Sequence, residues 1–389
     1  MIEGLNPRLI FAIAFVTGIL AVLYIDRNKI ERHSILFIRR TQRGIDLLDS
    51  IAKKAPRFWN IYGWIGVFFA LISIPLMVFQ MGWIVNNFIQ TGSSEGGPSA
   101  ILPGLTSDTT VGGNLEAGVT FIPVEYWVIS IAIIMIVHEA SHGIIARMED
   151  FEINSVGWLV LGIIPGAFVE PKGMKLGEDD EDEGLGAAEI WDQGTYKQRL
   201  KVLAAGSWAN YLTAAVFGAG YIALIAFILP AFFSGAVQYD AIDGYPAAEA
   251  GMNSGTLTTI NGQEVQSADE IQSILNGTSP GDTINLVSSE GEFEFELGER
   301  EGLETGFIGI TFSYPYYITW FVNLFAMIAF LNVAIGMFNM LPAKPLDGGH
   351  ILDTLIEGFG KEEQRKYVNY FSVLMWIIVL GSLITALIL

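Results

Sequence analysis

Residues 138–142 read His-Glu-Ala-Ser-His and lie inside an apolar run that extends from Tyr126 to Met148. His138 and His142 are four residues apart, so on a helix both imidazoles lie on one face and can bind one zinc ion. Glu139 stands beside them, in the position of a general base that takes a proton from water. Ionisable side chains inside a membrane cost roughly 2.5–3.5 kcal/mol each and are functional candidates by default. The sequence therefore predicts metal-dependent peptide hydrolysis within a bilayer.

A second motif offers a third metal ligand. Residues 339–350 read Asn-Met-Leu-Pro-Ala-Lys-Pro-Leu-Asp-Gly-Gly-His, and the chain has no cysteine, so only His, Asp or Glu can hold zinc. A catalytic zinc has three protein ligands and an open position for water, which two histidines and a carboxylate can provide. We predict Asp347 as the third ligand, although alone it could be the N-cap of a helix over 348–358. His350 is assigned no role, because a solvated histidine near a helix start is equally compatible.

The composition predicts an integral membrane protein. The 389 residues are 51% hydrophobic and only 16% charged, against about 25% charged in soluble domains. Six runs are long and apolar enough to span a bilayer. They cover approximately residues 9–25, 60–86, 126–147, 203–229, 316–341 and 367–389.

The basic residues predict the topology of these six segments. Lys and Arg in short loops mark the cytoplasmic side. With loop 26–58 inside, nineteen of the 21 basic residues lie in or beside the loops 26–58, 148–202 and 342–366, and only Arg8 and Arg300 lie outside. Both motifs then end at the cytoplasmic face, which places the active site near that side of the cell membrane.

Residues 156–169 are apolar but too short for a helical span, and three glycines and a proline interrupt them. We predict a β-hairpin or re-entrant element, which is tolerated at membrane depth only where protein or water satisfies its backbone. A crossing here would reverse every later segment and contradict the distribution of basic residues.

Two asparagines in apolar helices are candidate substrate-binding residues. Asn210 ends the segment Gly206-Ser207-Trp208-Ala209-Asn210, and Asn339 opens the second motif. Each could donate a hydrogen bond to a scissile carbonyl. Each could equally bond a neighbouring helix, with small residues allowing close approach.

Together these residues resemble the site-2 protease family of intramembrane zinc metalloproteases. The matching pieces are the HExxH motif at 138–142, the Gly-x-x-x-Asn segment at 206–210 and an Asn-x-x-Pro-x-x-x-x-Asp-Gly motif at 339–348. The resemblance implies that His138, His142 and Asp347 ligate one Zn²⁺ ion. It implies that Glu139 activates water, that Asn210 helps to bind or polarise the substrate carbonyl, and that the β-element holds an unwound substrate by strand addition.

Segment 236–310 differs from the rest, with 14 acidic residues and one basic residue, Arg300. Its predicted elements are a two-residue hairpin turn at Asn261-Gly262, a short helix from the capping box at 267–270 to about Leu275, and strands over 283–288 and 292–297. Residues 246–251 and 260–262 resemble the PDZ domains of this protease family. That resemblance implies an extracytoplasmic domain that filters substrates by bulk or binds a newly exposed terminus; a lid without a ligand is the alternative.

The expected fold is an α-helical multi-pass membrane protein of about six transmembrane helices, with a membrane-associated β-hairpin and an extracytoplasmic PDZ-like α+β domain. The predicted regions are 1–125, a two-helix N-terminal part; 126–235, the first part of the protease core; 236–310, the PDZ-like domain; 311–366, the second part of the core; and 367–389, a final helix. The expected partners are membrane-anchored protein substrates and the lipid bilayer. Nucleic acid is not expected, because the acidic outer domain would repel phosphates.

Two rival functions remain open. Intramembrane histidines and carboxylates also occur in transporters, but no inverted repeat is visible in the sequence. A catalytically inactive scaffold would bind membrane partners through its outer domain, but such a protein would not need Glu139 as a general base. The acidic bias and the lack of cysteine point to an archaeal source.

Overall fold

The computed structural model places most of the chain. It describes residues 7–92, 99–105, 118–162, 164–171, 194–229, 237–300, 305–312, 316–360 and 362–388. The chain divides into two compact units, of which one comprises Met1–Gly218 and Ala326–Leu389 and the other Ala219–Phe325. Every candidate zinc ligand lies in the first unit.

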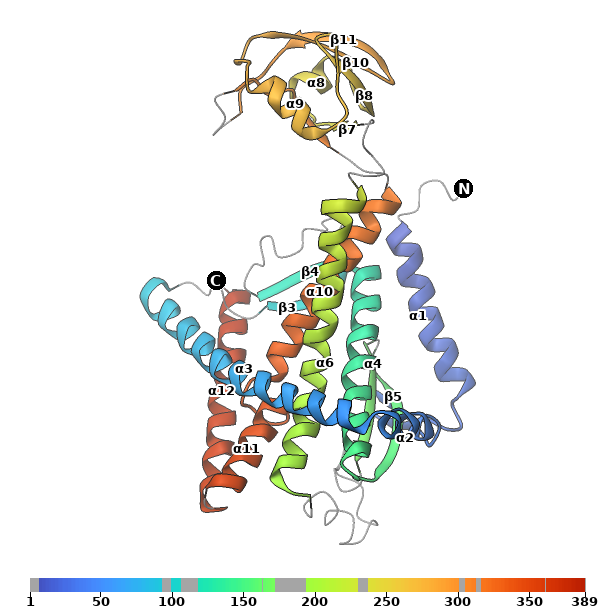
Figure 1. Ribbon diagram of the computed structural model, residues 1–389, viewed down its shortest axis with the longest axis vertical. Helices are drawn as coiled ribbons and strands as arrows, with labels where there is room; N and C mark the ends of the chain where they lie inside the picture. Colours follow the sequence, from blue (N-terminus) through green and yellow to red (C-terminus); the bar gives the residue numbers. More distant parts are fainter. Residues whose placement is uncertain are drawn as a thin grey trace. The chain divides into compact units, whose positions relative to one another are not determined.

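Six helices of the described chain are long and apolar enough to cross a membrane, which confirms the predicted number (Figure 1). They are α1 (Pro7–Ile25), α3 (Pro56–Thr91), α4 (Val124–Met148), α6 (Tyr196–Ala223) with its π-helical extension η1 (Leu224–Ile228), α10 (Tyr316–Asn339) and α12 (Arg365–Ile388). The shorter helices of the first unit are α2 (Ile45–Lys54), α11 (Asp347–Phe359) and the 3₁₀ turn η2 (Glu362–Gln364).

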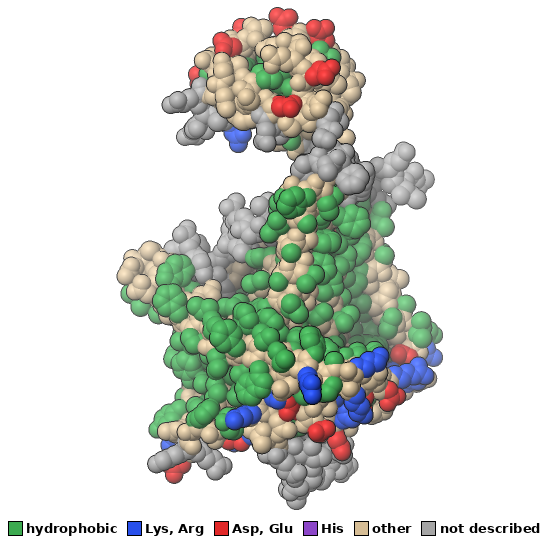
Figure 2. Space-filling model, in the orientation of Figure 1, with side chains coloured by type: hydrophobic (Ala, Val, Ile, Leu, Met, Phe, Trp, Pro, Cys, Tyr) green, Lys and Arg blue, Asp and Glu red, His purple; other side chains and the backbone are tan. Residues whose placement is uncertain are grey.

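The outer surface of the first unit is apolar. Figure 2 shows hydrophobic side chains across its helices, with Lys and Arg gathered along one border of the apolar region. Large exposed side chains include Phe68 and Phe79 on α3, Val216 on α6 and Ile377 on α12. Soluble monomers rarely expose contiguous apolar patches beyond about 300–600 Å². Together with the six long helices, this surface indicates a multi-pass membrane protein.

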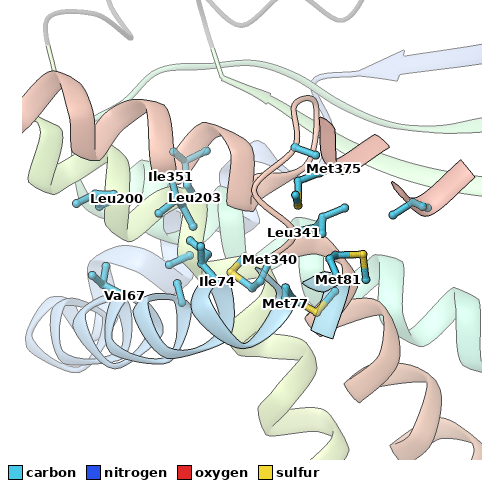
Figure 3. Close-up of a cluster of buried hydrophobic side chains, with 14 of the residues drawn as sticks. Val67, Ile74, Met77, Met81, Leu200, Leu203, Met340, Leu341, Ile351 and Met375 are labelled. Atoms are coloured by element: carbon cyan, nitrogen blue, oxygen red, sulfur yellow. The ribbon is translucent and has the colours of Figure 1, made fainter. Parts of the chain in front are cut away.

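A buried apolar core joins the helices behind the second motif (Figure 3). One face of α3, including Ile74 and Met77, packs against the start of α6 at Leu203. The same cluster contains Met340 and Leu341, which are both 0% exposed and directly follow α10. The core therefore fixes the short loop that leads from α10 to Asp347.

The predicted β-element is an antiparallel hairpin of β5 (Ile153–Leu161) and β6 (Ile164–Pro171), which confirms the hairpin interpretation. The sequence did not indicate its partners. Strands β1 (Glu31–His33) and β2 (Leu36–Thr41) come from the N-terminal basic loop, and the sheet order is β1-β2-β5-β6. In the described sheet, β6 is therefore an edge strand, and it is the strand that lies against α4.

Two further strands, β3 (Ser99–Gly104) and β4 (Gly118–Pro123), form a parallel pair that leads into α4. The Trp127 indole on α4 donates a hydrogen bond to the carbonyl of Ile101 on β3 at 3.1 Å. This contact ties the pair to the first turn of the helix that carries the first motif.

The second unit contains a small α+β fold with its own core, which includes Tyr239, Leu257, Ile271 and Leu286. Its strands are β7 (Val237–Ala241), β8 (Ser254–Ile260), β9 (Gln263–Glu264), β10 (Thr283–Ser288), β11 (Gly291–Glu296) and β12 (Ile310–Phe312), and its short helices are α8 (Pro246–Glu249) and α9 (Ala268–Leu275). The main sheet order is β11-β10-β8-β7-β12.

The local predictions for this unit are confirmed. Asn261 and Gly262 both have positive φ, at 50° and 77°, and form the two-residue turn between β8 and β9. The backbone N–H of Glu270 donates to Ser267 Oγ at 3.3 Å, which caps α9 at the predicted start. The two predicted strands are β10 and β11, and β11 begins one residue earlier than expected.

Candidate metal centre

The two histidines of the first motif converge on one point beside α4. His138 and His142 are one helical turn apart, and their Nε2 atoms are 3.0 Å from each other. His138 is buried, with only 8% of its surface exposed. Two imidazoles with facing ring nitrogens need a shared cation or proton between them, because two nitrogen lone pairs would otherwise repel.

Asp347 completes this group from a separate part of the chain. Its Oδ2 lies 3.3 Å from His138 Nε2 and 3.5 Å from His142 Nε2. Zinc–ligand bonds of about 2.0–2.2 Å in a tetrahedron place neighbouring ligand atoms roughly 3.3–3.5 Å apart. The two distances to Asp347 match the edge of a zinc tetrahedron, and the 3.0 Å between the two Nε2 atoms is slightly shorter, so the three atoms could hold one zinc ion.

Two observations show that the site has the electrostatics and the space for a cation. Asp347 Oδ2 is buried and has no hydrogen-bond partner in the described chain. Burial raises the pKa of this carboxyl, but the adjacent His142 and His138 rings lower the pKa more, so the carboxylate stays ionised. A Cβ on Gly206 of α6 would lie 2.3 Å from His142 Nε2, so the glycine leaves this space open.

A backbone carbonyl of α6 orients His142. Its Nδ1 lies 2.7 Å from the carbonyl oxygen of Val202, to which it donates when Nε2 binds a metal. The motif helix is also tied to its neighbours through Ser141, which donates to the carbonyl of Ala205 at 2.9 Å. Tyr62 on α3 lies 3.0 Å from the same hydroxyl. The second x of HExxH therefore fixes α4 against α3 and α6.

Asp347 is the first residue of α11, and its position depends on two glycines. A Cβ on Gly348 would come 2.4 Å from the carbonyl oxygen of Met340, and one on Gly349 would come 2.4 Å from the nitrogen of Lys344. The Asp-Gly-Gly sequence thus lets the helix start pack directly on the preceding loop. The alternative that Asp347 caps the helix is not seen, because Leu346 is the N-cap and no side chain bonds it.

Ion pairs and hydrogen bonds hold this loop from its other side. Lys344 Nζ donates to Asp353 Oδ2 at 2.8 Å, and Arg365 donates to the same carboxylate at 2.9 Å. The indole of Trp376 on α12 donates to the carbonyl of Lys344 at 2.9 Å. The Asp347 carboxylate is therefore placed by α11, α12 and the core together.

Glu139 lies between the ligands and the edge strand β6. Its Oε2 accepts a hydrogen bond from the backbone N–H of Val169 at 3.1 Å. His138, Glu139, Asn339 and Asp347 line a common cleft of about 250 Å³. Glu139 thus faces the same cleft as His138 and Asp347, and its carboxylate is bonded to the backbone of β6.

The two candidate substrate-binding asparagines have different surroundings. Asn339, at the end of α10, lines the cleft. Asn210 is 0% exposed, is not among the residues of that cleft, and lies with its Nδ2 3.1 Å from His138 Nδ1. That either residue contacts substrate stays a prediction. His350, one turn beyond Asp347, is not part of the ligand group in the described chain.

Sequence reasoning missed three contributors to the site: the Ser141 hydroxyl, the Val202 carbonyl and the Val169 amide. The segment from Gly206 to Asn210 was predicted as a candidate, but its sequence did not indicate that Gly206 lies against the two histidine rings. The backbone groups carry no signal of their own in the sequence.

Comparison with known proteins gives the family. Residues 126–381 match peptidase family M50. An uncharacterised protein of Methanocaldococcus jannaschii is 23% identical over 410 residues, which span 97% of this chain and 98% of that protein. A candidate zinc metalloprotease of Clostridium perfringens is 24% identical over 328 residues, with 64% of this chain and 93% of the relative covered. One of Helicobacter pylori is 29% identical over 176 residues, with 40% and 47% covered. The matched region includes Glu139 and the grouped residues His138, His142 and Asp347, and it covers more than half of the chain, so the chain belongs to peptidase family M50, the site-2 protease family of zinc metalloproteases.

Proposed function

We propose that this protein is an intramembrane endopeptidase that holds one zinc ion. It cuts membrane-anchored proteins in or near their transmembrane segments and so releases a domain into the cytoplasm, as in regulated intramembrane proteolysis. The observation that carries the proposal is the convergence of His138, His142 and Asp347 at the end of a membrane-length helix.

The residues around the cleft account for hydrolysis. His138, His142 and Asp347 would hold the zinc ion, which when bound would supply a Lewis acid and lower the pKa of a water towards neutrality. Glu139 takes the proton of the attacking water and passes it to the leaving amine. The Val169 amide keeps the Glu139 carboxylate directed into the cleft. Asn339, on the opposite helix, donates to the scissile carbonyl as negative charge develops there.

The edge strand β6 is a template for an extended substrate. A transmembrane helix hides its amides in its own hydrogen bonds, so it must unwind before hydrolysis. Among the described strands none pairs with the outer edge of β6, and Glu139 bonds to Val169 on this strand, so strand addition there would bring a scissile bond to the general base. Pro165 and Pro171 have no N–H to donate, which limits the template to the residues between them.

An apolar cavity at the far end of β6 fits a membrane substrate. The cavity has a volume of about 500 Å³ and is lined by α1, β3, β4, the first turns of α4, and Ile164. Ile164 precedes Val169 by five positions, which is about 16 Å along a strand. A substrate that extends along β6 from Glu139 can therefore place an apolar side chain here.

The charges of the first unit support a cytoplasmic active site. Arg147 on α4 pairs with Asp49, Arg199 on α6 with Glu357, and Lys201 with Glu149. These pairs lie in the last turn of α4 and the first turns of α6, and Asn339 ends α10. By the rule for basic loops this end is cytoplasmic, and the acidic domain after α6 is extracytoplasmic.

The test is the cleavage of two matched reporters by the detergent-solubilised full chain. The first carries one transmembrane helix, and the second has that helix replaced by a polar linker in the same protein. We expect the helical reporter to be cut at least about tenfold faster, since only apolar segments fill the cavity beside β6. Mass spectrometry should place the cut in or beside the helix. Equal cleavage of both reporters, or cuts only in soluble parts, would refute intramembrane specificity.

The acidic domain has a groove suited to a peptide terminus. The groove has a volume of about 200 Å³ and runs between α9 and residues 305–312. Arg300, the only base between residues 236 and 310, lines it, with its guanidinium 4.9 Å from the centroid of the Phe307 ring. We propose that this PDZ-like domain binds the carboxylate of a newly exposed C-terminus at Arg300.

Replacing Arg300 by Ala should therefore weaken the binding of a peptide with a free carboxylate and an apolar last residue. Hydrogen bonds to charged groups contribute about 1.5–3 kcal/mol, which corresponds to a loss of roughly tenfold or more. Fluorescence anisotropy with the full chain measures the dissociation constant. The same peptide with an amidated C-terminus is the control, and it should bind weakly to both proteins. Tight binding of the amidated peptide would contradict carboxylate recognition.

A further inference from the structure

Asn210 is fully buried beside a candidate metal ligand. It lies on α6, is 0% exposed, and its carboxamide contacts Nδ1 of His138 at 3.1 Å through Nδ2. Its other polar atom, Oδ1, is buried without a hydrogen-bond partner in the described chain. A buried amide oxygen without a donor costs about 1–3 kcal/mol, so an arrangement that satisfies it is favoured.

The protons of the two histidines decide which arrangement that is. A neutral imidazole that binds a metal through Nε2 carries its proton on Nδ1 and needs an acceptor there. His142 has such an acceptor, the Val202 carbonyl at 2.7 Å. For His138, the group that contacts Nδ1 is the Asn210 amide. With Nδ2 towards the ring, the proton of His138 must sit on Nε2, the atom that faces His142 and Asp347.

Rotation of the Asn210 amide by half a turn gives Oδ1 a donor and removes the conflict at His138 Nε2. Amide oxygen and nitrogen are nearly equal in size, so the same cavity holds either orientation. Oδ1 then accepts from His138 Nδ1–H, and His138 Nε2 presents its lone pair to the metal.

Gly206 lies one turn before Asn210 on the same face of α6 and faces the same two rings. A Cβ there would lie 2.3 Å from His142 Nε2 and 2.7 Å from His138 Nε2. One turn of α6 thus faces one turn of α4. Gly206 leaves space at the Nε2 atoms that would hold the ion, and Asn210 contacts the other ring nitrogen of His138, Nδ1. This arrangement gives a physical reason for the Gly-x-x-x-Asn spacing.

We propose that Asn210 is a positioning residue that accepts the Nδ1 proton of His138 and thereby directs Nε2 to the zinc ion. The inference rests on the proposed zinc site and goes beyond it, because it gives Asn210 a role behind the ligand in place of contact with substrate.

The test compares three variants of the full chain in detergent by zinc affinity, measured by competition with a chromogenic chelator. Asn210→Leu keeps the approximate volume and removes the acceptor, and we expect a loss of about 10–100-fold in zinc affinity. Asn210→Asp keeps an acceptor at the same place and should retain the affinity of the unmodified protein. Asn332→Leu is the matched control: Asn332 is also 0% exposed in a membrane helix, but its Nδ2 donates to the carbonyl of Ile328.

Cobalt substitution gives a second readout that a general loss of stability would not produce. The visible bands of tetrahedral Co²⁺ should weaken and shift in Asn210→Leu and return in Asn210→Asp. The inference would be overturned if zinc affinity were unchanged in Asn210→Leu, or if it fell equally in the Leu and Asp variants. Neither outcome would contradict the proposal that the unmodified protein binds zinc at this site. Absence of zinc binding by the unmodified protein would overturn the proposed function and this inference together.

Discussion

Replacement of Glu139 by Gln is expected to lower the cleavage rate at least about 100-fold while the zinc content stays unchanged, because a general base contributes about 10²–10⁴ in rate. The two side chains have the same shape, and an amide oxygen can still accept the hydrogen bond from Val169 N–H that the carboxylate accepts at 3.1 Å. The ligand group of His138, His142 and Asp347 does not include this side chain. The substitution therefore removes the proton acceptor and leaves the rest of the cleft in place.

The measurement combines cleavage of the single-helix reporter with metal analysis of the same purified samples. Glu152→Gln is the control, since it makes the same chemical change at an exposed carboxylate outside the cleft. That variant should cleave at the unmodified rate. Unchanged cleavage by Glu139→Gln would remove Glu139 as the base. Loss of zinc together with activity would show that the carboxylate acts on the metal site instead.

The grouping of the three candidate ligands could be predicted because most of its signals are local. Two histidines four residues apart share a helix face whatever surrounds them, and a carboxylate between two apolar segments has few structural uses. Predicting that Asp347 joins the histidines needed one further step. The distribution of basic residues predicts that both motifs reach the same face of the membrane. In the structure, the Nε2 atoms of His138 and His142 and the Oδ2 atom of Asp347 lie within a few ångströms of one another.

The sheet beside the centre could be predicted only in part. The hairpin of β5 and β6 has apolar strands and a glycine turn, which are local signals. Strand β2 pairs with β5 across more than 100 residues of chain, with Phe37 opposite Val160. Strand β2 contains Arg39 and Arg40, and the charge of its loop indicates topology but not strand pairing. A long-range register of this kind depends on tertiary packing and leaves no mark in the local pattern.

The roles of the two asparagines could not be separated from sequence. Asn210 and Asn339 are the same residue type in similar apolar helices, and only the rotation of each helix decides which side chain faces the cleft. Close contacts at glycines set that rotation. A Cβ on Gly336 of α10 would lie 2.8 Å from Tyr211 and 3.2 Å from the Cβ of Asn210. Which helix approaches at a glycine is a property of the packed bundle.

Replacement of Asp347 by Asn is expected to reduce zinc affinity by about 100-fold or more, since loss of even a residue behind a ligand costs about 10–100-fold. The carboxylate is the negative charge of the ligand group, and its Oδ2 is 3.3 Å and 3.5 Å from the two Nε2 atoms. A neutral amide provides a weaker oxygen ligand. It can also turn its NH₂ group towards the histidines, where it would compete for the lone pairs that bind zinc.

Competition with a chelator measures the affinity, and the melting temperature of the metal-free protein shows whether the fold is intact. His350→Gln is the control on the same helix, because His350 lies one turn from Asp347 and outside the ligand group. It should retain zinc. If His350→Gln lost zinc as fully as Asp347→Asn, the imidazole would be a ligand and the open position for water would be in question. If Asp347→Asn kept full zinc affinity, the geometry of the three atoms would not reflect metal binding, and Asp347 would serve only to start α11.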